Sequence, residues 1–151
     1  MSKVSYSLLS LNFSKVKGLS VKQVGTLIGG KVGANISGEI FRNGCAIRLS
    51  YAFNYSGLPI RRGFGSVSTG GDGKLYLYRV NDMLTFLKAN ISRKPLVGKT
   101  SSDFKGKQGI IVFLECSWAD ATGHVDLYNG SVVEGTDYSA DCKKIHFYEL
   151  K

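Results

Sequence analysis

Hydrophobic residues in the first 95 positions recur every three or four residues, which is the spacing of an amphipathic helix. One helix is predicted through residues 21–28, where Ser20 can cap the start and a pair of glycines marks the end. A second is predicted through residues 45–57, with Gly57 as its stop, and a third through residues 80–91. We therefore expect a helix-rich N-terminal part.

After Pro95 the pattern changes to alternation and to short apolar runs bounded by turn-forming residues, which is typical of β-strands. Three strands are predicted, in QGIIVFLECSW, GHVDLY and KKIHFYEL, and Asn129 with Gly130 signals a tight turn after the second. An antiparallel sheet packed on the earlier helices makes the expected fold class α+β. Because the chain contains no repeat, low-complexity tract or linker, we expect residues 1–151 to form a single domain.

The chain carries 20 lysines and arginines against 11 acidic residues, a formal net charge of +9 that favours an anionic partner. Nucleic acid, acidic lipid and an anionic cell-wall polymer all meet this requirement. The basic residues are spread along the sequence without a long run, which favours a solvated basic surface over a dedicated nucleic-acid groove. We expect no nucleic-acid partner.

The N-terminal segment MSKVSYSLLSLNFSKVKG lacks the apolar core and the small-residue cleavage site of a secretory signal peptide. No stretch approaches the run of roughly 20 apolar residues that a membrane span requires. We expect a protein that does not insert into membranes and whose export, if any, uses another route.

Three cysteines are too few for a disulfide framework, and their spacing contains no paired CxxC arrangement for a metal. Cys116 and Cys142 can pair in an oxidising compartment, which leaves Cys45 as the odd reactive thiol. Two unpaired, partly buried thiols are an equally acceptable interpretation, because free cysteine often fills apolar space. We expect neither a metal nor an organic cofactor.

Cys45 is predicted to open the second helix, in the segment NGCAIRLSYAFN. A thiol at that position faces unpaired backbone N–H groups and the positive end of the helix dipole, which favours the thiolate. The same N–H groups can donate to an oxyanion that develops at an attacked carbonyl. An inert buried cysteine is the alternative interpretation of this residue taken alone.

His124 changes that balance, because a catalytic histidine is typically distant from its cysteine in sequence and adjacent to it in space. The only other histidine, His146, lies between Ile145 and Phe147 and is interpreted as a packed strand residue. Acidic residues near His124 offer a carboxylate that can orient the imidazole and stabilise its charged form. The sequence therefore predicts a cysteine hydrolase with His124 as its base.

Two aspartates compete for the orienting role. Asp126 is two residues after His124 and shares its face of the strand, at about 7 Å between Cα atoms. Counting outward from a two-residue turn pairs His124 with Gly135, so that Asp137 lies diagonal to the histidine and within reach. We expect Asp137 to orient His124, with Asp126 as an alternate or second partner.

The segments TLIGGKVGANI, NGCAIRLSYAFNYSGLPI, QGIIVFLECSWADATGHVDLYNG and IHFYEL together resemble the fourth family of type VI secretion amidase effectors. The most specific parts are the CAIRLSYAFN and GHVDLYNG blocks. The resemblance implies a papain-like hydrolase fold related to the NlpC-type cell-wall peptidases, with the cysteine at a helix N-terminus. It carries the catalytic roles over to Cys45, His124 and Asp137.

The resemblance also implies a function. It implies hydrolysis of the amide between γ-D-glutamate and meso-diaminopimelate in peptidoglycan stems. Delivery by the type VI secretion apparatus into the periplasm of a rival cell is implied as well, together with a cognate immunity protein. Arg48, one turn after Cys45, can face a substrate carboxylate or form an ordinary surface ion pair. Trp118 is a further candidate for substrate binding.

Two other functions fit parts of the sequence. A cysteine deamidase or acyltransferase that acts on protein glutamine would use the same thiol and imidazole, because the shape of the cleft decides the substrate. A small basic nucleic-acid-binding module is suggested by the net charge of +9 and eight tyrosines. Loss of activity on replacing Cys45 separates the two enzymes from the binding module.

Overall fold

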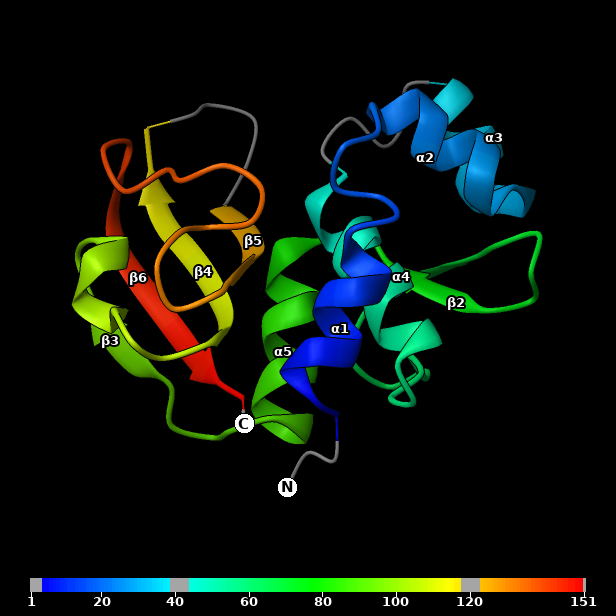
Figure 1. The fold of residues 1–151 in the computed structure, drawn as a ribbon. Helices are drawn as coiled ribbons and strands as arrows, with labels where there is room; N and C mark the ends of the chain where they lie inside the picture. The colour runs from blue at the N-terminus through cyan, green and yellow to red at the C-terminus, as the bar shows by residue number, and fades with distance from the viewer. Residues whose placement is uncertain (1–3, 39–43, 118–122, 151) are drawn as a thin grey trace.

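The helices form one half of the molecule and a four-stranded sheet the other (Figure 1). The computed structural model describes residues 4–38, 44–117 and 123–150. None of the described helices is long and apolar enough to cross a membrane. The helices are α1 (Tyr6–Phe13), α2 (Val21–Ile28), α3 (Gly30–Ser37), α4 (Cys45–Tyr55) and α5 (Val80–Asn90).

Local signals explain why the predicted helices begin and end where they do. At α2, Ser20 and Gln23 form a reciprocal capping box, which satisfies two N–H groups at the helix start. Gly29 ends α2 at a positive φ of 70°, a conformation that glycine adopts without strain. The chain then starts α3 at Gly30, so the predicted stop is confirmed and a further helix follows it. The first helix, α1, was also not predicted.

The sheet contains β3 (Leu96–Gly98), β4 (Gly109–Cys116), β5 (Gly123–Tyr128) and β6 (Cys142–Glu149), in the order β3-β6-β4-β5. All neighbouring strands are antiparallel, which confirms the α+β prediction. A separate hairpin of β1 (Val67–Thr69) and β2 (Leu75–Leu77) extends the helical half, and a short 3-10 helix, η1 (Ser101–Phe104), follows β3. The hairpin, β3 and η1 were not predicted.

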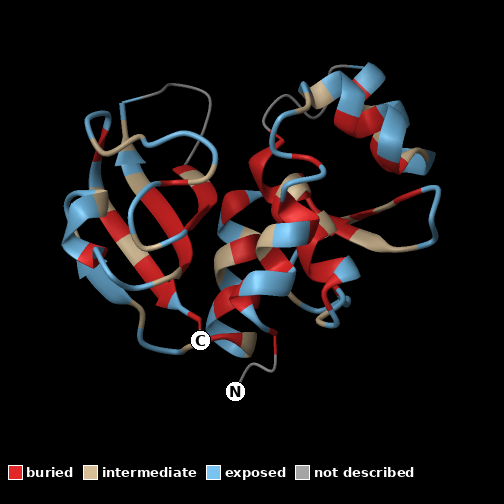
Figure 2. Cartoon of the chain, viewed as in Figure 1, coloured by how far each residue is buried: buried red, intermediate tan, exposed pale blue. Residues whose placement is uncertain are grey.

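Two hydrophobic clusters pack on the two faces of the sheet (Figure 2). The larger cluster joins Val112 and Val125 of the sheet to helix residues such as Phe53. The smaller cluster covers the other face with aromatic rings, including Phe113 and Phe147. The strand β5 contributes to both clusters and packs against α4, so the fold brings GHVDLY and the helix of Cys45 together.

The turn after β5 is longer than the predicted two-residue turn. Tyr128 bridges Val133 rather than Ser131, and the Asn129 side chain accepts hydrogen bonds from the backbone N–H groups inside the turn. Gly130 has a φ of 99°, which suits glycine. The side chain of Asn129 thus stabilises a wider loop, and the predicted register is wrong by two residues.

A disulfide joins Cys116 at the end of β4 to Cys142 at the start of β6, with 3.9 Å between the Cα atoms. The sheet makes these two residues direct partners, so the pairing follows from strand register. Of the two interpretations that the sequence allowed, the structure has the disulfide. Trp118, the further candidate for substrate binding, lies outside the described residues.

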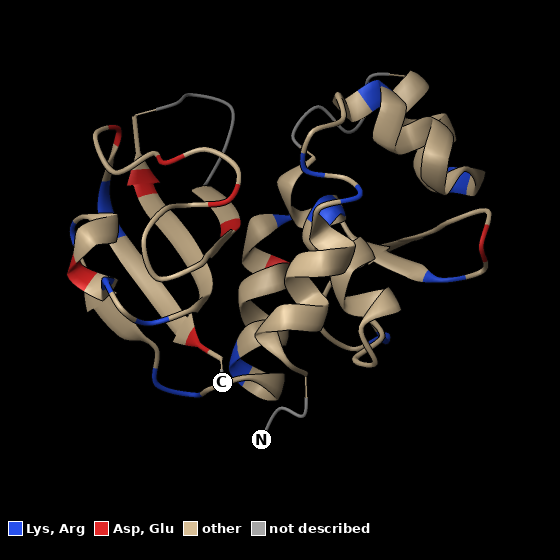
Figure 3. Cartoon of the chain, in the orientation of Figure 1, with Lys and Arg blue, Asp and Glu red and all other residues tan. Residues whose placement is uncertain are grey.

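Charge is unevenly divided between the halves (Figure 3). Lysines and arginines occur in both halves: in the helical half up to Lys88 of α5, and in the sheet half as far as β6. The helical half contains Asp72 and Asp82 among its described residues, whereas most acids lie in the sheet half. The half that carries Cys45 is therefore the more basic one. The described acids of the sheet half are Asp103, Glu115, Asp126, Glu134, Asp137, Asp141 and Glu149.

Candidate active site

Cys45 is the first residue of α4 and its side chain is buried. Gly44 precedes it as the N-cap and accepts the first helical hydrogen bond, from the backbone N–H of Arg48. A Cβ atom on Gly44 would lie 2.9 Å from the Cγ2 atom of Val21, so the close approach of α2 requires glycine here. The thiol therefore has the helix N-terminal position that the sequence predicted, where the dipole favours an anion.

Arg48 packs against the backbone that precedes Cys45. Its Nη2 atom donates to the Leu19 carbonyl at 3.0 Å, and its Nη1 atom lies 3.2 Å from the point where a Gly44 Cβ would stand. The Nε atom is buried and has no hydrogen-bond partner among the described residues. Within that part of the chain no carboxylate forms an ion pair with Arg48, in contrast to the ion-pair interpretation.

His124 lies on β5 with its ring between two aromatic side chains. The ring centroids of Tyr138 and Phe113 are 4.8 and 6.0 Å from that of the imidazole. Burial disfavours the charged imidazole, but hydrogen bonds with Asp126 and Cys45 and the charges of both outweigh it and raise the pKa of His124 to about 9. The structure thus brings the predicted base and nucleophile into hydrogen-bond contact.

Asp126 holds the other side of the imidazole. Its Oδ2 atom lies 2.8 Å from Nε2 of His124, which leaves Nδ1 for the Cys45 thiol. The carboxylate is buried and also accepts hydrogen bonds from the backbone N–H groups of Leu127, Gly135 and Thr136, at 2.8, 2.9 and 3.0 Å. Four donors therefore fix its two oxygens in one orientation.

Asp137 does not take the position beside His124 that was predicted for it. Burial raises the pKa of Asp137, but hydrogen bonds from the side chains of Ser101 and Ser139 and from the backbone N–H of Ser139 outweigh it and lower that pKa. The backbone N–H of Glu134 still donates to the Leu127 carbonyl of β5, but those of Gly135 and Thr136 donate to the Asp126 side chain. The chain therefore stops pairing with β5 after residue 134. The alternate partner, Asp126, is the residue at the imidazole.

The second histidine lies elsewhere, as predicted. His146 is a residue of β6 between Val97 of β3 and Val112 of β4. Burial lowers its pKa, and the charges of Lys144 and Lys88 lower it further. This favours a neutral ring. The structure therefore assigns one histidine to the site and one to packing.

Sequence reasoning missed the residues that hold Asp126 in place. Gly135 and Thr136 act through their backbone, which leaves no residue-type signal in the sequence. Gly135 is nevertheless required, because a Cβ atom there would lie 2.3 Å from Oδ2 of Asp126. Among the described residues no group of three or more His, Cys, Asp or Glu side chains is arranged to hold a metal ion.

A buried thiol at a helix N-terminus, an imidazole in contact with it and a carboxylate that orients the imidazole are the parts needed for acyl transfer through a covalent intermediate. The thiol supplies the nucleophile and the imidazole moves the proton. The N–H groups at the start of α4 are available to an oxyanion.

The chain is similar to known proteins in sequence and in structure. The family described as "Type VI secretion system (T6SS), amidase effector protein 4", or Tae4, matches residues 41–148. No curated protein sequence matches the chain. The structure is similar to a chain of the Tae4–Tai4 effector–immunity complex from Salmonella Typhimurium, with 39% identity, a TM-score of 0.92 and coverage of 99% of this chain and 100% of that one.

Two structures from Enterobacter cloacae are also similar. A chain of its Tae4–Tai4 effector–immunity complex is 37% identical, with a TM-score of 0.91 and 99% of both chains covered. Its effector Tae4 is likewise 37% identical, with a TM-score of 0.91 and 100% of both chains covered. The likeness confirms the expected papain-like, NlpC-type α+β fold, and the family match covers both sequence blocks that suggested it. The chain belongs to the Tae4 family of type VI secretion amidase effectors.

Proposed function

We propose that this antibacterial peptidoglycan amidase effector is a cysteine enzyme, with Cys45 as nucleophile, His124 as acid and base, and Asp126 as the residue that orients the imidazole. The observation that carries the proposal is the connected series from the thiol through the imidazole to the buried carboxylate. The position of Cys45 at the start of α4 supports it, because helix N–H groups favour both the thiolate and a developing oxyanion.

In the proposed reaction the Cys45 thiol gives its proton to His124, its sulfur attacks the carbonyl carbon of the amide, and the carbonyl oxygen becomes an oxyanion. His124 then gives its proton to the departing amine, and a thioester remains on the enzyme. A water molecule gives a proton to His124 as it attacks the thioester. The C–S bond then breaks, the carboxylic acid leaves, and His124 returns the proton to the Cys45 sulfur. Asp126 keeps the imidazole in the tautomer and orientation that both proton transfers need.

The proposed bond is the amide between γ-D-glutamate and meso-diaminopimelate, which makes the enzyme a D,L-endopeptidase. The resemblance of the CAIRLSYAFN and GHVDLYNG blocks to the family supports this choice. The proposed place of action is the periplasm of a target cell, reached through the secretion apparatus. The disulfide supports an oxidising compartment. The effector–immunity complexes of its relatives support a cognate immunity protein as partner.

Digestion of purified peptidoglycan tests the proposal. The protein is expected to release a new diaminopimelate amine, which mass spectrometry of the stem fragments identifies. Cys45→Ala and His124→Ala should lower the rate by several orders of magnitude. The matched variant His146→Ala should stay close to wild type, because that ring is outside the site.

Three results would contradict parts of the proposal. Equal rates for wild type and Cys45→Ala would exclude cysteine catalysis. Cleavage of a different amide would overturn the choice of bond. Intact stems together with ammonia release from protein glutamine would favour the deamidase alternative.

A further inference from the structure

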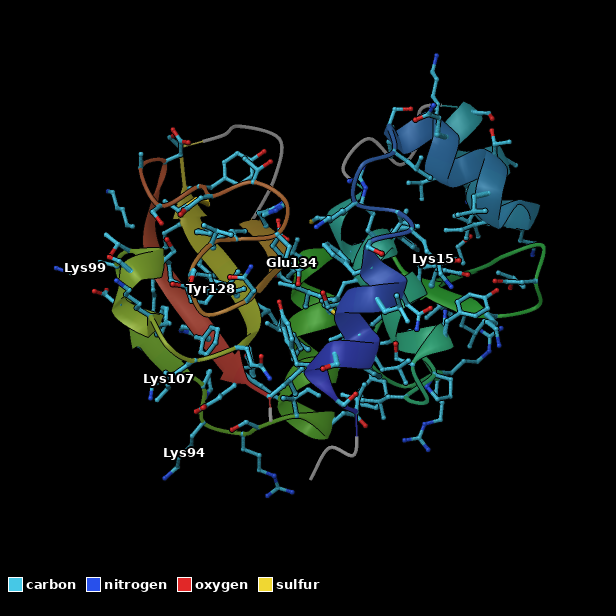
Figure 4. The ribbon with its side chains drawn as sticks, viewed as in Figure 1. Lys15, Lys94, Lys99, Lys107, Tyr128 and Glu134 are labelled. Atoms are coloured by element: carbon cyan, nitrogen blue, oxygen red, sulfur yellow. A yellow bond between two sulfur atoms is a disulfide. The ribbon has the colours of Figure 1, made fainter. Side chains whose placement is uncertain are left out.

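The carboxylate of Glu134 is buried at the junction between the two halves of the molecule (Figure 4). Its side chain is 7% exposed and accepts hydrogen bonds from two hydroxyl groups of α1. Ser10 donates at 2.8 and 3.0 Å to the two oxygens, and Tyr6 donates to Oε2. Lys17 reaches the same carboxylate at 3.4 Å. A buried carboxylate with this many donors is a specific contact, because it loses them all if the halves separate.

The helix α1 belongs to the half of the molecule that carries the nucleophile. It packs on α4, and its buried Asn12 donates from Nδ2 to the Tyr55 carbonyl at 3.1 Å and to the Ser56 hydroxyl at 3.0 Å. These acceptors lie at the C-terminal end of the helix that begins with Cys45. Through α1, the Glu134 side chain is therefore connected to the helix that carries Cys45.

The backbone next to Glu134 belongs to the other side of the site. Its own N–H donates to the Leu127 carbonyl of β5 at 2.8 Å. The next two residues, Gly135 and Thr136, donate their N–H groups to Asp126. One short segment, residues 134–136, thus contacts α1 through a side chain and Asp126 through its backbone.

We propose that Glu134 is a positioning residue for catalysis, which anchors residues 134–136 to α1 and so fixes His124 and Asp126 relative to Cys45. The inference rests on the proposed function of these three residues. Burial raises the pKa of Tyr6, and the hydrogen bond and charge of Glu134 and the charge of Asp126 raise it further. Tyr6 therefore stays protonated and donates its hydrogen bond to Glu134. Glu134 acts through its hydrogen bonds with Tyr6 and Ser10 and its ion pair with Lys17.

The test compares Glu134→Ala and Glu134→Gln with the matched variant Glu149→Ala, whose carboxylate is exposed at the end of β6. For Glu134→Ala we expect kcat on peptidoglycan to fall about ten- to hundredfold with little change in KM, because a displacement of about 1 Å near reacting groups has that effect. Glu134→Gln keeps an acceptor and should retain more activity. Glu149→Ala should match wild type.

A second readout follows the imidazole directly. The chain has two histidines, so NMR titration of the ring C–H signals resolves His124, with His146 as an internal reference. In Glu134→Ala the pKa of His124 should fall, because its hydrogen bonds with Asp126 and Cys45, which both raise that pKa, loosen. The pKa of His146 should not move.

Two outcomes overturn the proposal. One is an unchanged kcat in Glu134→Ala. The other is a lower thermal unfolding midpoint with an unchanged His124 titration, which would make Glu134 a structural residue only. If Glu134→Ala fails to fold, Ser10→Ala removes one donor to the same carboxylate and should shift both readouts in the same direction. The titration needs no substrate, so it stands even if the proposed peptidoglycan reaction fails.

Discussion

Asp126→Asn changes one oxygen of a carboxylate whose acceptor positions are all in use. Oδ1 accepts from the N–H groups of Leu127 and Gly135, and Oδ2 accepts from His124 and the N–H of Thr136. An amide group in place of either oxygen points its own hydrogens at two donors. Turned toward Leu127 and Gly135, the amide leaves both backbone N–H groups without an acceptor. Turned the other way, it leaves the N–H of Thr136 without one, and the imidazole keeps a hydrogen bond only by accepting from the amide in the other tautomer.

The structure sets the size of the effect. Each buried donor left without a partner costs about 1–3 kcal/mol, and one or two donors are left, so the free energy of unfolding should fall by about 1–6 kcal/mol. That is a large part of the roughly 5–15 kcal/mol that stabilises a domain of this kind. If the asparagine keeps its oxygen toward the backbone, the imidazole loses its acceptor. Loss of the orienting carboxylate in a comparable triad lowers kcat about 10⁴-fold.

The assay pairs urea unfolding with the rate of peptidoglycan digestion for Asp126→Asn and for Asp137→Asn. Asp137 is the matched control, since serine side chains hold it away from the imidazole. We expect Asp126→Asn to lose stability and nearly all activity, and Asp137→Asn to lose little activity. A fully active Asp126→Asn variant, or an inactive Asp137→Asn beside it, would refute the assignment.

Three further predictions concern the same region. Gly135→Ala should lower kcat up to about 100-fold at nearly unchanged KM, because its Cβ would stand 2.3 Å from Oδ2 of Asp126 and displace it; steady-state kinetics measure this. The pKa of His124 is raised from its ordinary 6.5 to about 9, so protonation of this ring adds to the free energy of unfolding. The contribution is complete below pH 6.5 and is lost as the pH rises toward 9. Thermal melts should show that loss in wild type and a smaller one in His124→Asn. Reduction of the Cys116–Cys142 disulfide, with a sequence separation of 26, should lower the free energy of unfolding by about 3.5 kcal/mol, measured by denaturant titration with and without reductant.

Much of the fold could be predicted because the pattern and the packing agree. The helix from Cys45 buries Ala46, Leu49 and Phe53 of a predicted apolar stripe, and the strand in QGIIVFLECSW is buried from Gly109 to Phe113, as a continuous apolar run predicts. The helix α1 was missed because it buries Leu9 and Phe13 but exposes Leu8 and Leu11, so its apolar residues do not fall on one face. The short strands β1 and β3 have three residues each, too few for a period to show.

The residues of the site also differ in whether the sequence could predict them. Cys45 and His124 could be predicted because helix position and residue type identify them. The choice between Asp126 and Asp137 depended on counting residues through a turn, and the Asn129 side chain lengthened that turn. The backbone donors to Asp126 had no signal in the sequence, since every residue except proline carries the same N–H group.

The disulfide has a consequence for how the protein resists proteases. His124, Asp126 and the segment that holds them all lie between Cys116 and Cys142. A single proteolytic cut in that interval opens the covalent loop without releasing either piece, because the disulfide still joins the two. The strands on either side, β4 and β6, stay paired along their length. A nicked protein thus runs as one species without reductant and as two with it, and keeps the imidazole tethered beside Cys45.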